Sequence, residues 1–232
     1  MIRIVAPEER HFTDFGWLQT YWLFSFSNYY DPSNLRHGAL RVFNDDVVQP
    51  GSGFPTHPHQ EMEITTIVLS GEITHEDSMG NRAVIKAGDV QRMSAGTGLT
   101  HSEFNLSKEP VAFYQIWIQP GVRRLEPSYD QRAYDASAWR GRLFPVAAGQ
   151  TLPDVVTLHA DATIYRASLD GGGSLEFEME RDRKVFVYLT AGQMEINGLK
   201  LAEKGQARAE AESGLELKAV TDSELVLIDV PG

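Results

Sequence analysis

Two short motifs in the first half of the chain combine side chains that bind metals. The first is His57-Pro58-His59, and the second is His101-Ser102-Glu103, so the two metal-binding groups of each motif are two positions apart. In an extended strand, side chains two positions apart share a face, so each motif directs its two groups the same way. Three neutral imidazoles and a carboxylate suit a divalent first-row metal: Fe(II), Mn, Ni, Cu or Zn. Four protein ligands would leave a coordination position open, which is typical of catalytic sites.

Spacing alone leaves the identity of the carboxylate open. Glu61 and Glu63 continue the face of the first motif if its strand does not bulge, whereas Glu103 shares a face with His101. An isolated His-x-His pair is weak evidence, because most such pairs are ordinary surface or core residues. Two pairs at the same short spacing, flanked by glycines, favour one shared metal site.

The remaining histidines and aromatic residues are interpreted without chemistry. His75 lies in a polar stretch near a turn and is expected to be solvated, and His11 and His37 are expected to be ordinary polar residues. The aromatic segment Trp17–Tyr30 is predicted to serve core and lid packing rather than a cofactor.

Short runs of β-branched and aromatic residues, separated by Gly, Pro and Asn-Gly breaks, must position the motifs, and they predict an all-β protein. Helical periodicity is weak, with short helical turns and a linker expected near Pro127–Ala138. Asn197-Gly198 predicts a type I′ hairpin. The main predicted strands are Glu63–Leu69, Glu72–His75, Ala83–Ile85, Val111–Ile118, Lys184–Leu189, Met194–Ile196, Leu199–Leu201 and Glu224–Val230.

A repeated unit divides the chain. Ile64–Gly71 resembles Val185–Gly192. Each is followed by a hairpin and then by a lysine shortly before a glycine, Lys86-Ala87-Gly88 in the first copy and Lys204-Gly205 in the second. Two copies of one β unit predict two β-barrels or sandwiches side by side, which we place at residues 1–134 and 135–232.

The second unit lacks the histidine pair. Aligned through Gly71 and Gly192, the positions of the first-motif histidines and of Glu63 are occupied by Glu178, Glu180 and Lys184. We therefore expect one metal, in the first unit, and a second unit without metal ligands.

Composition narrows the class of protein. The 232 residues carry a formal charge of −11. Because such an acidic surface repels the phosphate backbone, direct nucleic-acid binding is not expected. The lack of cysteine excludes disulfides, Fe–S clusters and thiolate zinc sites. The N-terminus has no long apolar run, and no segment approaches the ~18 apolar residues of a membrane helix. We expect a cytoplasmic monomer without membrane contact.

These motifs resemble the pirin family of the cupin superfamily, whose bacterial members include quercetin 2,3-dioxygenases. The resemblance covers essentially the whole chain and implies a bicupin, with two double-stranded β-helix barrels and one metal in the first. Carried over residue by residue, it implies His57, His59, His101 and Glu103 as ligands. General cupins take the carboxylate from the position of Glu63 instead. The resemblance is carried by 26–32, 41–46, 53–59, 75–81, 93–103 and 114–118.

The resemblance implies two functions. One is a metal-dependent dioxygenase of flavonols, which opens the quercetin heterocycle with release of carbon monoxide, with Fe(II) as the expected metal and Glu103 as catalytic base. Phe43, Phe54 and Phe104 are candidates for the wall of the substrate pocket. The alternative is a metal- or redox-responsive regulator that binds a transcription factor or another enzyme as its protein partner. Consumption of O2 with quercetin separates the two.

Overall fold

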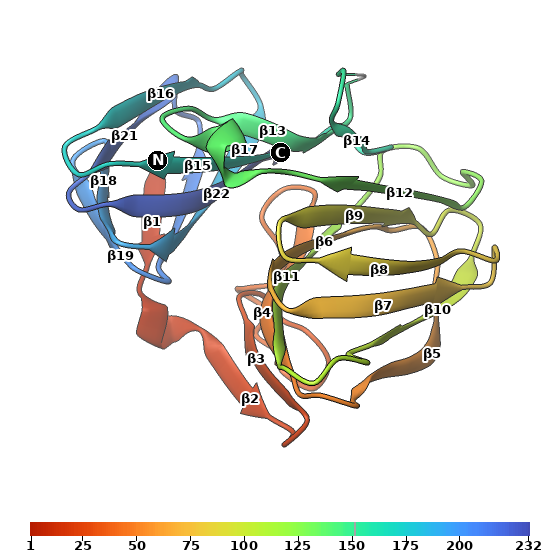
Figure 1. Ribbon diagram of the computed structural model, residues 1–232. Helices are drawn as coiled ribbons and strands as arrows, with labels where there is room; N and C mark the ends of the chain where they lie inside the picture. The colour runs from red at the N-terminus through yellow and green to blue at the C-terminus, as the bar shows by residue number, and fades with distance from the viewer. Residues whose placement is uncertain (151) are drawn as a thin grey trace.

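The computed structural model describes residues 1–150 and 152–232 and consists almost entirely of β-strands. Figure 1 shows two barrels side by side, each made of one large and one small sheet. Within the described residues, no helix is both long and apolar enough to cross a membrane. The predicted all-β class is therefore confirmed, and the repeated unit corresponds to the two barrels.

The first barrel holds both metal-binding motifs. Its small sheet has the order β5-β10-β7-β8, with β5 (Gly53–His59), β7 (Glu72–Asp77), β8 (Arg82–Lys86) and β10 (Leu99–Phe104). Its large sheet has the order β12-β9-β6-β11-β4-β3-β2, with β2 (His11–Asp14), β3 (Leu18–Trp22), β4 (Leu40–Val48), β6 (Glu63–Ser70), β9 (Asp89–Ser94), β11 (Val111–Ile118) and β12 (Ser128–Ala133).

The second barrel repeats this plan. Its small sheet has the order β16-β21-β18-β19, with β16 (Ser174–Glu178), β18 (Gln193–Ile196), β19 (Leu199–Ala202) and β21 (Gly214–Ala219). Its large sheet has the order β1-β20-β17-β22-β15-β13-β14, with β1 (Ile2–Val5), β13 (Phe144–Ala148), β14 (Val156–Thr157), β15 (Thr163–Leu169), β17 (Arg183–Ala191), β20 (Gln206–Glu210) and β22 (Ser223–Pro231).

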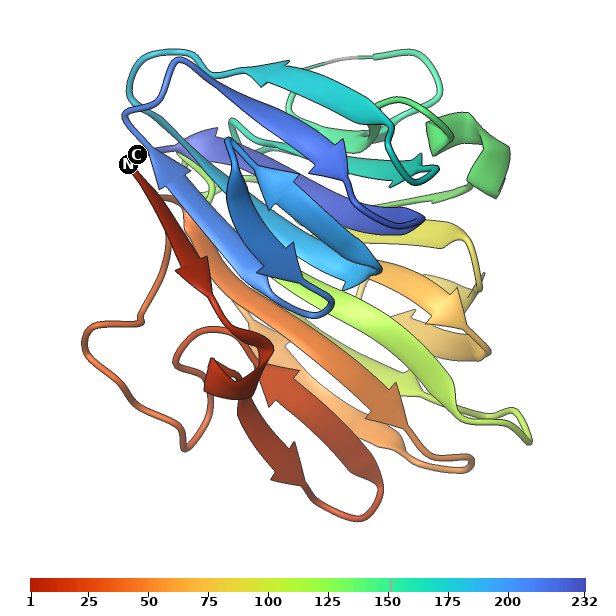
Figure 2. The same ribbon diagram turned by 90° about the vertical axis from the view of Figure 1, so that its left-hand side faces the viewer.

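The chain passes between the barrels near its N-terminus as well as near its middle. The first strand, β1, pairs with β20 and so lies in the sheet of the second barrel. Figure 2 shows β1, in red, alongside the blue strands of this barrel. The division between residues 134 and 135 stays a prediction. Although β1 precedes this boundary in the sequence, it belongs to the sheet of the second barrel.

Local signals were read correctly at one turn and incorrectly at another. Asn197 and Gly198 both have positive φ, 48° and 78°, as a type I′ hairpin requires, so that prediction is confirmed. The helical turns expected near 127–138 are only partly present. Ser128–Ala133 is a strand that pairs with β9, and a short 3-10 helix follows at Ala136–Trp139, with another at Pro7–Glu9. The weak local pattern of 128–133 is overridden by sheet pairing.

Aromatic packing joins the two barrels through their large sheets. The Phe43 ring lies 5.3 Å from that of Phe186 and 4.9 Å from that of Tyr188, measured between centroids. Phe43 is fully buried in this interface. Phe43 is therefore part of the core between the barrels, and the prediction that it lines the substrate pocket was wrong.

Strand pairing shows which residues of the second barrel correspond to the metal-binding motifs of the first. Ile196, which stands at the position of His75, pairs with Leu217 just as His75 pairs with Glu103. Leu215 then takes the position of His101, and its partner across β16 is Phe177.

The earlier alignment of Glu178 and Glu180 with the first-motif histidines was wrong by one residue. The segment before β17 is one residue longer than its counterpart before β6, so counting along the chain slips the register, which exchanges the inward and outward faces of a strand. Glu178 and Glu180 are exposed, whereas Phe177 and Met179 face inward. Aliphatic and aromatic side chains thus fill the space that the histidines occupy in the first barrel.

Candidate metal centre

The two motifs converge because β5 and β10 are neighbours in the small sheet of the first barrel. His57 and His101 are direct cross-strand partners, and their Nε2 atoms lie 3.1 Å apart. The His59 ring lies 4.7 Å from the His57 ring and 4.9 Å from the His101 ring. One ring nitrogen from each histidine can be chosen so that all three lie within 4.8 Å of one another.

The surroundings of His57 fix which of its nitrogens is free. Its Nδ1 lies 2.8 Å from the carbonyl oxygen of Pro55, which can only accept a hydrogen bond. Nδ1 therefore carries the proton, and Nε2 presents a lone pair toward His101. Two nitrogen ligands at right angles, each ~2.1 Å from an ion, lie ~3 Å apart, so the observed separation suits a shared metal.

A buried relay orients His101 in the same way. Asp77 Oδ2 accepts a hydrogen bond from His75 Nε2 at 3.1 Å, which leaves His75 Nδ1 as an acceptor. His101 Nδ1 lies 3.5 Å from that atom and is the only one of the two with a proton to donate. Nε2 of His101 is then the lone pair that faces His57.

His75 was expected to be solvated, and this was wrong. Its exposed fraction is 0%. Its polar neighbours in the sequence suggested a turn, but β7 continues to Asp77 and lies beside β10. Burial alone would raise the pKa of Asp77, but hydrogen bonds from Asn81 and His75 lower it, so the carboxylate at the end of the relay is ionised at neutral pH.

Burial keeps the imidazoles of His59 and His101 neutral. It lowers the pKa of His101 to about 3, with His57 and His75 adding to the effect. It lowers the pKa of His59 to about 4, with the neighbouring imidazoles again contributing. Neutral imidazole is the form that binds a metal, so little proton release would accompany binding near pH 7.

Glu103 enters the site through a β-bulge. The register of β10 against β5 shifts between His101 and Glu103. Glu103 is 1% exposed, and its Oε2 accepts a hydrogen bond from Gln115 Nε2 at 2.9 Å. Its Oε1 is buried without a hydrogen-bond partner among the described residues. A buried, unpartnered carboxylate oxygen is costly unless a cation balances it, so the donor set fits a metal. Glu103 forms a second close group with His75 and His101.

The other candidate carboxylates point elsewhere. The condition that the strand continues beyond His59 fails, because β5 ends there and Glu61 has a positive φ of 54°. Glu63 is fully buried at the interface between the barrels, where its Oε2 accepts a hydrogen bond from the backbone of His159 at 3.0 Å. The imidazole nearest to Glu63 Oε1 belongs to His159, whose Nδ1 lies 4.0 Å away, and not to a histidine of the cluster.

An aromatic cavity of about 380 Å³ opens onto the cluster. His57, His59 and Glu103 lie on its wall together with Phe54. Phe54 was expected there, whereas Phe104 does not line this cavity. The segment Trp17–Tyr30 contributes Leu23 and Phe24 to the core, as expected. Trp17, Trp22 and Phe26 of this segment line the wall, together with Phe15 just before it and Trp117 of β11.

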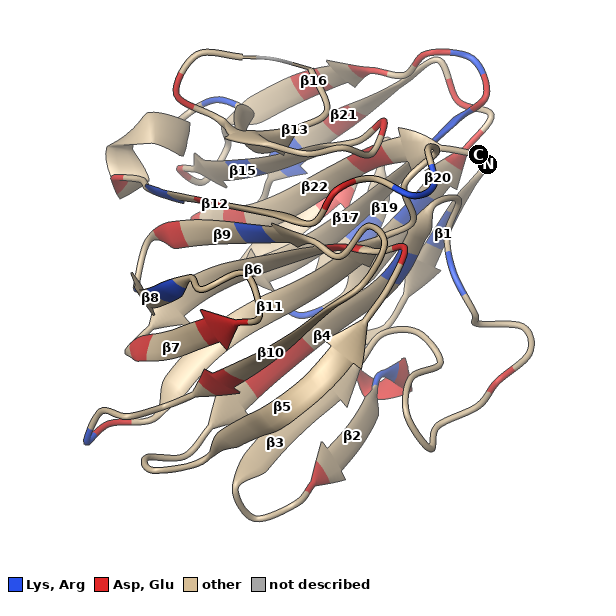
Figure 3. Ribbon diagram, turned by 90° about the vertical axis from the view of Figure 1, so that its right-hand side faces the viewer, with Lys and Arg blue, Asp and Glu red and all other residues tan. Residues whose placement is uncertain are grey.

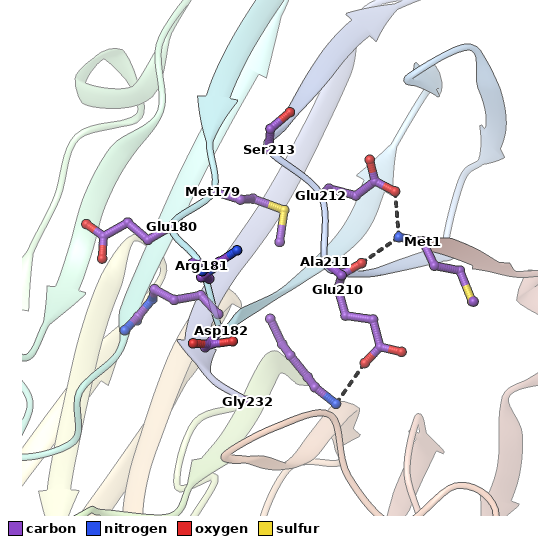
Figure 4. A pocket seen from close by; sticks show the side chains of 12 residues that line it. Met1, Met179, Glu180, Arg181, Asp182, Glu210, Ala211, Glu212, Ser213 and Gly232 are labelled. Atoms are coloured by element: carbon purple, nitrogen blue, oxygen red, sulfur yellow. Dashed lines mark hydrogen bonds and ion pairs between the residues drawn. The ribbon is translucent and has the colours of Figure 1, made fainter.

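A larger cavity, of about 890 Å³, lies on the second barrel and is lined by both chain termini. Figure 4 shows ion pairs between some of the charged groups on its wall. Lys184 Nζ lies 2.8 Å from Glu210 Oε2, and the Met1 amino group pairs with Glu212. These pairings leave the histidine cluster of the first barrel as the stronger candidate for a functional centre.

Two cupin-type barrels, one with a histidine cluster between neighbouring strands of its small sheet, define a bicupin. The model of the pirin family matches residues 5–118, and a model described as the quercetinase C-terminal cupin domain matches residues 146–230. This chain belongs to the pirin family, as its motifs indicated.

Relatives of known name cover the whole chain. A quercetin 2,3-dioxygenase of Escherichia coli strain K12 is 40% identical over 100% of this chain and 99% of its own length. A pirin-like protein of Caulobacter vibrioides is 40% identical over 93% of this chain and 94% of its own. The crystal structure of bacterial pirin YhhW from Escherichia coli in complex with nickel(II) matches with a TM-score of 0.94 and 38% identity, over 100% of this chain and 99% of that one.

Proposed function

We propose that this protein is a metal-dependent dioxygenase that opens the heterocycle of quercetin-like flavonols. The proposed ligands of one divalent first-row metal are His57, His59, His101 and Glu103, and Fe(II) is the proposed ion. The observation that carries the proposal is the convergence of three imidazoles and a buried, unpartnered carboxylate oxygen on an aromatic cavity. The name of the Escherichia coli relative and the nickel(II) complex of YhhW support the same class of reaction and a bound metal.

Glu103 is the proposed base. A bound divalent metal lowers the pKa of a hydroxyl group that it coordinates. One oxygen of Glu103 suffices as a ligand, so the other can accept the proton of the substrate hydroxyl. Gln115 donates to Oε2 and fixes the orientation of the carboxylate. The deprotonated flavonol is electron-rich and reacts with O2. Both oxygen atoms enter the ring-opened ester, and carbon monoxide leaves.

The cavity favours a neutral aromatic substrate. The rings of Trp22, Phe26 and Trp117 offer surfaces against which a flat ligand can stack. Among the described residues, no Lys or Arg lines this cavity. Figure 3 shows acidic segments on β4, β7 and β10 of the same barrel. An anionic phosphate or carboxylate would find no basic side chain here, whereas a flavonol needs none.

The test is turnover of quercetin by metal-loaded protein. Protein reconstituted separately with Fe(II), Mn(II), Ni(II), Cu(II) and Zn(II) is mixed with quercetin, and O2 consumption and carbon monoxide are measured. We expect one O2 consumed and one carbon monoxide released per quercetin with at least one metal, and neither with metal-free protein. Tight metal binding without turnover for every metal would contradict the proposal and leave the non-enzymatic alternative.

The buried relay supplies a further prediction, for metal affinity. His75→Phe removes the acceptor that holds His101 Nδ1, so the lone pair of His101 Nε2 is no longer oriented. Loss of such an outer partner of a ligating histidine typically weakens metal binding by about 10–100-fold. Competition with a chromophoric chelator measures the change in dissociation constant.

His11→Phe is the matched control. His11 stacks on Tyr29 at 4.2 Å and has no recorded contact with the cluster, so the same exchange there should leave metal affinity unchanged. An equal affinity in the His75→Phe and native proteins would show that the relay does not orient the ligand.

A further inference from the structure

Two polar side chains on the cavity wall have no part in the proposed reaction. Asn44 and Asp46 are two residues apart on β4, so their side chains share one face of the strand. Both are 2% exposed, and both line the cavity of about 380 Å³. Oδ1 of each is buried without a hydrogen-bond partner in the part of the chain that the structure describes.

The polar neighbour of Asn44 is committed to other partners, and Thr20, opposite Asp46 on β3, has a buried hydroxyl without a hydrogen-bond partner in the described chain. Gln115 is the cross-strand neighbour of Asn44 on β11, but its amide nitrogen donates to Glu103 at 2.9 Å. Its amide oxygen accepts a hydrogen bond from the indole of Trp117 at 3.3 Å. Buried polar groups almost always find a partner in a folded protein. The free oxygens of Asn44 and Asp46 therefore indicate a partner that enters the cavity.

The chemistry of the pair selects a neutral partner. Burial raises the pKa of Asp46 to about 8, with Thr20 acting against it and the carboxylates of Asp45 and Glu103 adding to it. Oδ1 of Asn44 accepts, and the carboxyl group of Asp46 accepts and, in its protonated form, also donates. A hydroxyl group, which also donates and accepts, satisfies both side chains.

We propose that Asn44 and Asp46 form a hydroxyl-recognition subsite, which hydrogen-bonds to a ring hydroxyl of the bound aromatic ligand other than the one beside Glu103. The inference rests on the proposed function, because the ligand is the same molecule. The subsite sets the preference among hydroxylated aromatic compounds. It does not set metal affinity, because neither side chain is among the proposed ligands.

The experiment compares ligands that differ by hydroxyl groups. Zn(II)-loaded protein is titrated without O2 with quercetin, kaempferol, galangin and fisetin, and quenching of the tryptophan fluorescence of the cavity gives each dissociation constant. The variants are Asp46→Val and Asn44→Val, each tested alone. Thr66→Val is the matched control, because Thr66 also carries a buried, unpartnered hydroxyl in this barrel but does not line the cavity.

We expect at least one analogue to bind native protein and Thr66→Val about tenfold or more weakly than quercetin, because a site built for a hydroxyl rejects the compound that lacks it. In Asp46→Val or Asn44→Val this ratio should fall to within about twofold of one, because the polar pair is broken. Unchanged ratios in both variants would overturn the proposal, and so would native protein that binds no flavonol.

Failure of the subsite and failure of the proposed function give different results. Discrimination that depends on Asn44 and Asp46, without turnover for any metal, keeps the subsite and refutes the dioxygenase. Turnover with ligand ratios that are the same in all variants keeps the dioxygenase and refutes the subsite.

Discussion

Replacing His101 with alanine is expected to remove the metal and all turnover while both barrels stay folded. His101 is the residue shared by the two close groups of potential ligands, and its Nε2 faces His57 at 3.1 Å. The stability of the fold comes mainly from apolar burial, and the aromatic interface around Phe43 and Phe186 lies outside the histidine cluster. Elemental analysis, circular dichroism and O2 consumption on the same preparation measure the three effects.

His159→Ala is the control for this experiment. His159 is an exposed histidine whose contacts are with Glu63 and Ser94 rather than with the cluster. We expect it to retain metal and turnover. If His101→Ala instead unfolds the protein completely, the histidine cluster is structural rather than catalytic.

Glu103→Gln is expected to slow turnover far more than it weakens metal binding. Glutamine keeps the shape and a neutral oxygen donor but cannot accept the substrate proton. Loss of a general base typically lowers the rate by ~10²–10⁴-fold. Rates must be compared at equal metal occupancy, measured in the same sample, because a weaker ligand also lowers the metal content.

Glu63→Gln provides the matching carboxylate exchange. Glu63 is as buried as Glu103 but contacts the second barrel, so its metal-corrected rate should equal that of native protein. An unchanged metal-corrected rate in Glu103→Gln would show that Glu103 is only a ligand. Since Glu63 does not line the cavity, proton removal would then rest on the acidity of the chelated flavonol itself.

Much of the fold could be predicted because its signals are local. Strands such as Val111–Ile118 are dense in β-branched and aromatic residues, and the Asn197-Gly198 turn requires two positive φ angles that few residue pairs adopt. The repeat was visible through its glycines. The strand at Ser128–Ala133 was missed because its stability comes from pairing with β9, which no local pattern records.

The convergence of the two motifs could be predicted because residues two apart in a strand share a face. The orienting partners could not. His75 is fully buried only because β7 lies beside β10, and its polar neighbours in the sequence gave the opposite impression. The slip by one residue in the second barrel has a similar origin, since the length of one loop decides which face of β16 points inward.

The subsite of Asn44 and Asp46 was not predicted either. Both residues lie in a stretch that reads as an ordinary strand. Nothing in the sequence separates Asp45, whose Oδ2 accepts a hydrogen bond from Tyr188 of the second barrel, from Asp46, which faces the cavity. Strand alternation would have found the difference if the inward face of β4 had been known.

The measurement that tests the central claim most directly is the position of the metal in a crystal of metal-loaded protein, located by its anomalous scattering. We expect one ion in the first barrel, ~2.0–2.3 Å from a ring nitrogen of His57, His59 and His101 and from a carboxylate oxygen of Glu103. An ion bound to Glu63 with Glu103 turned away, or an ion in the second barrel, would contradict the account.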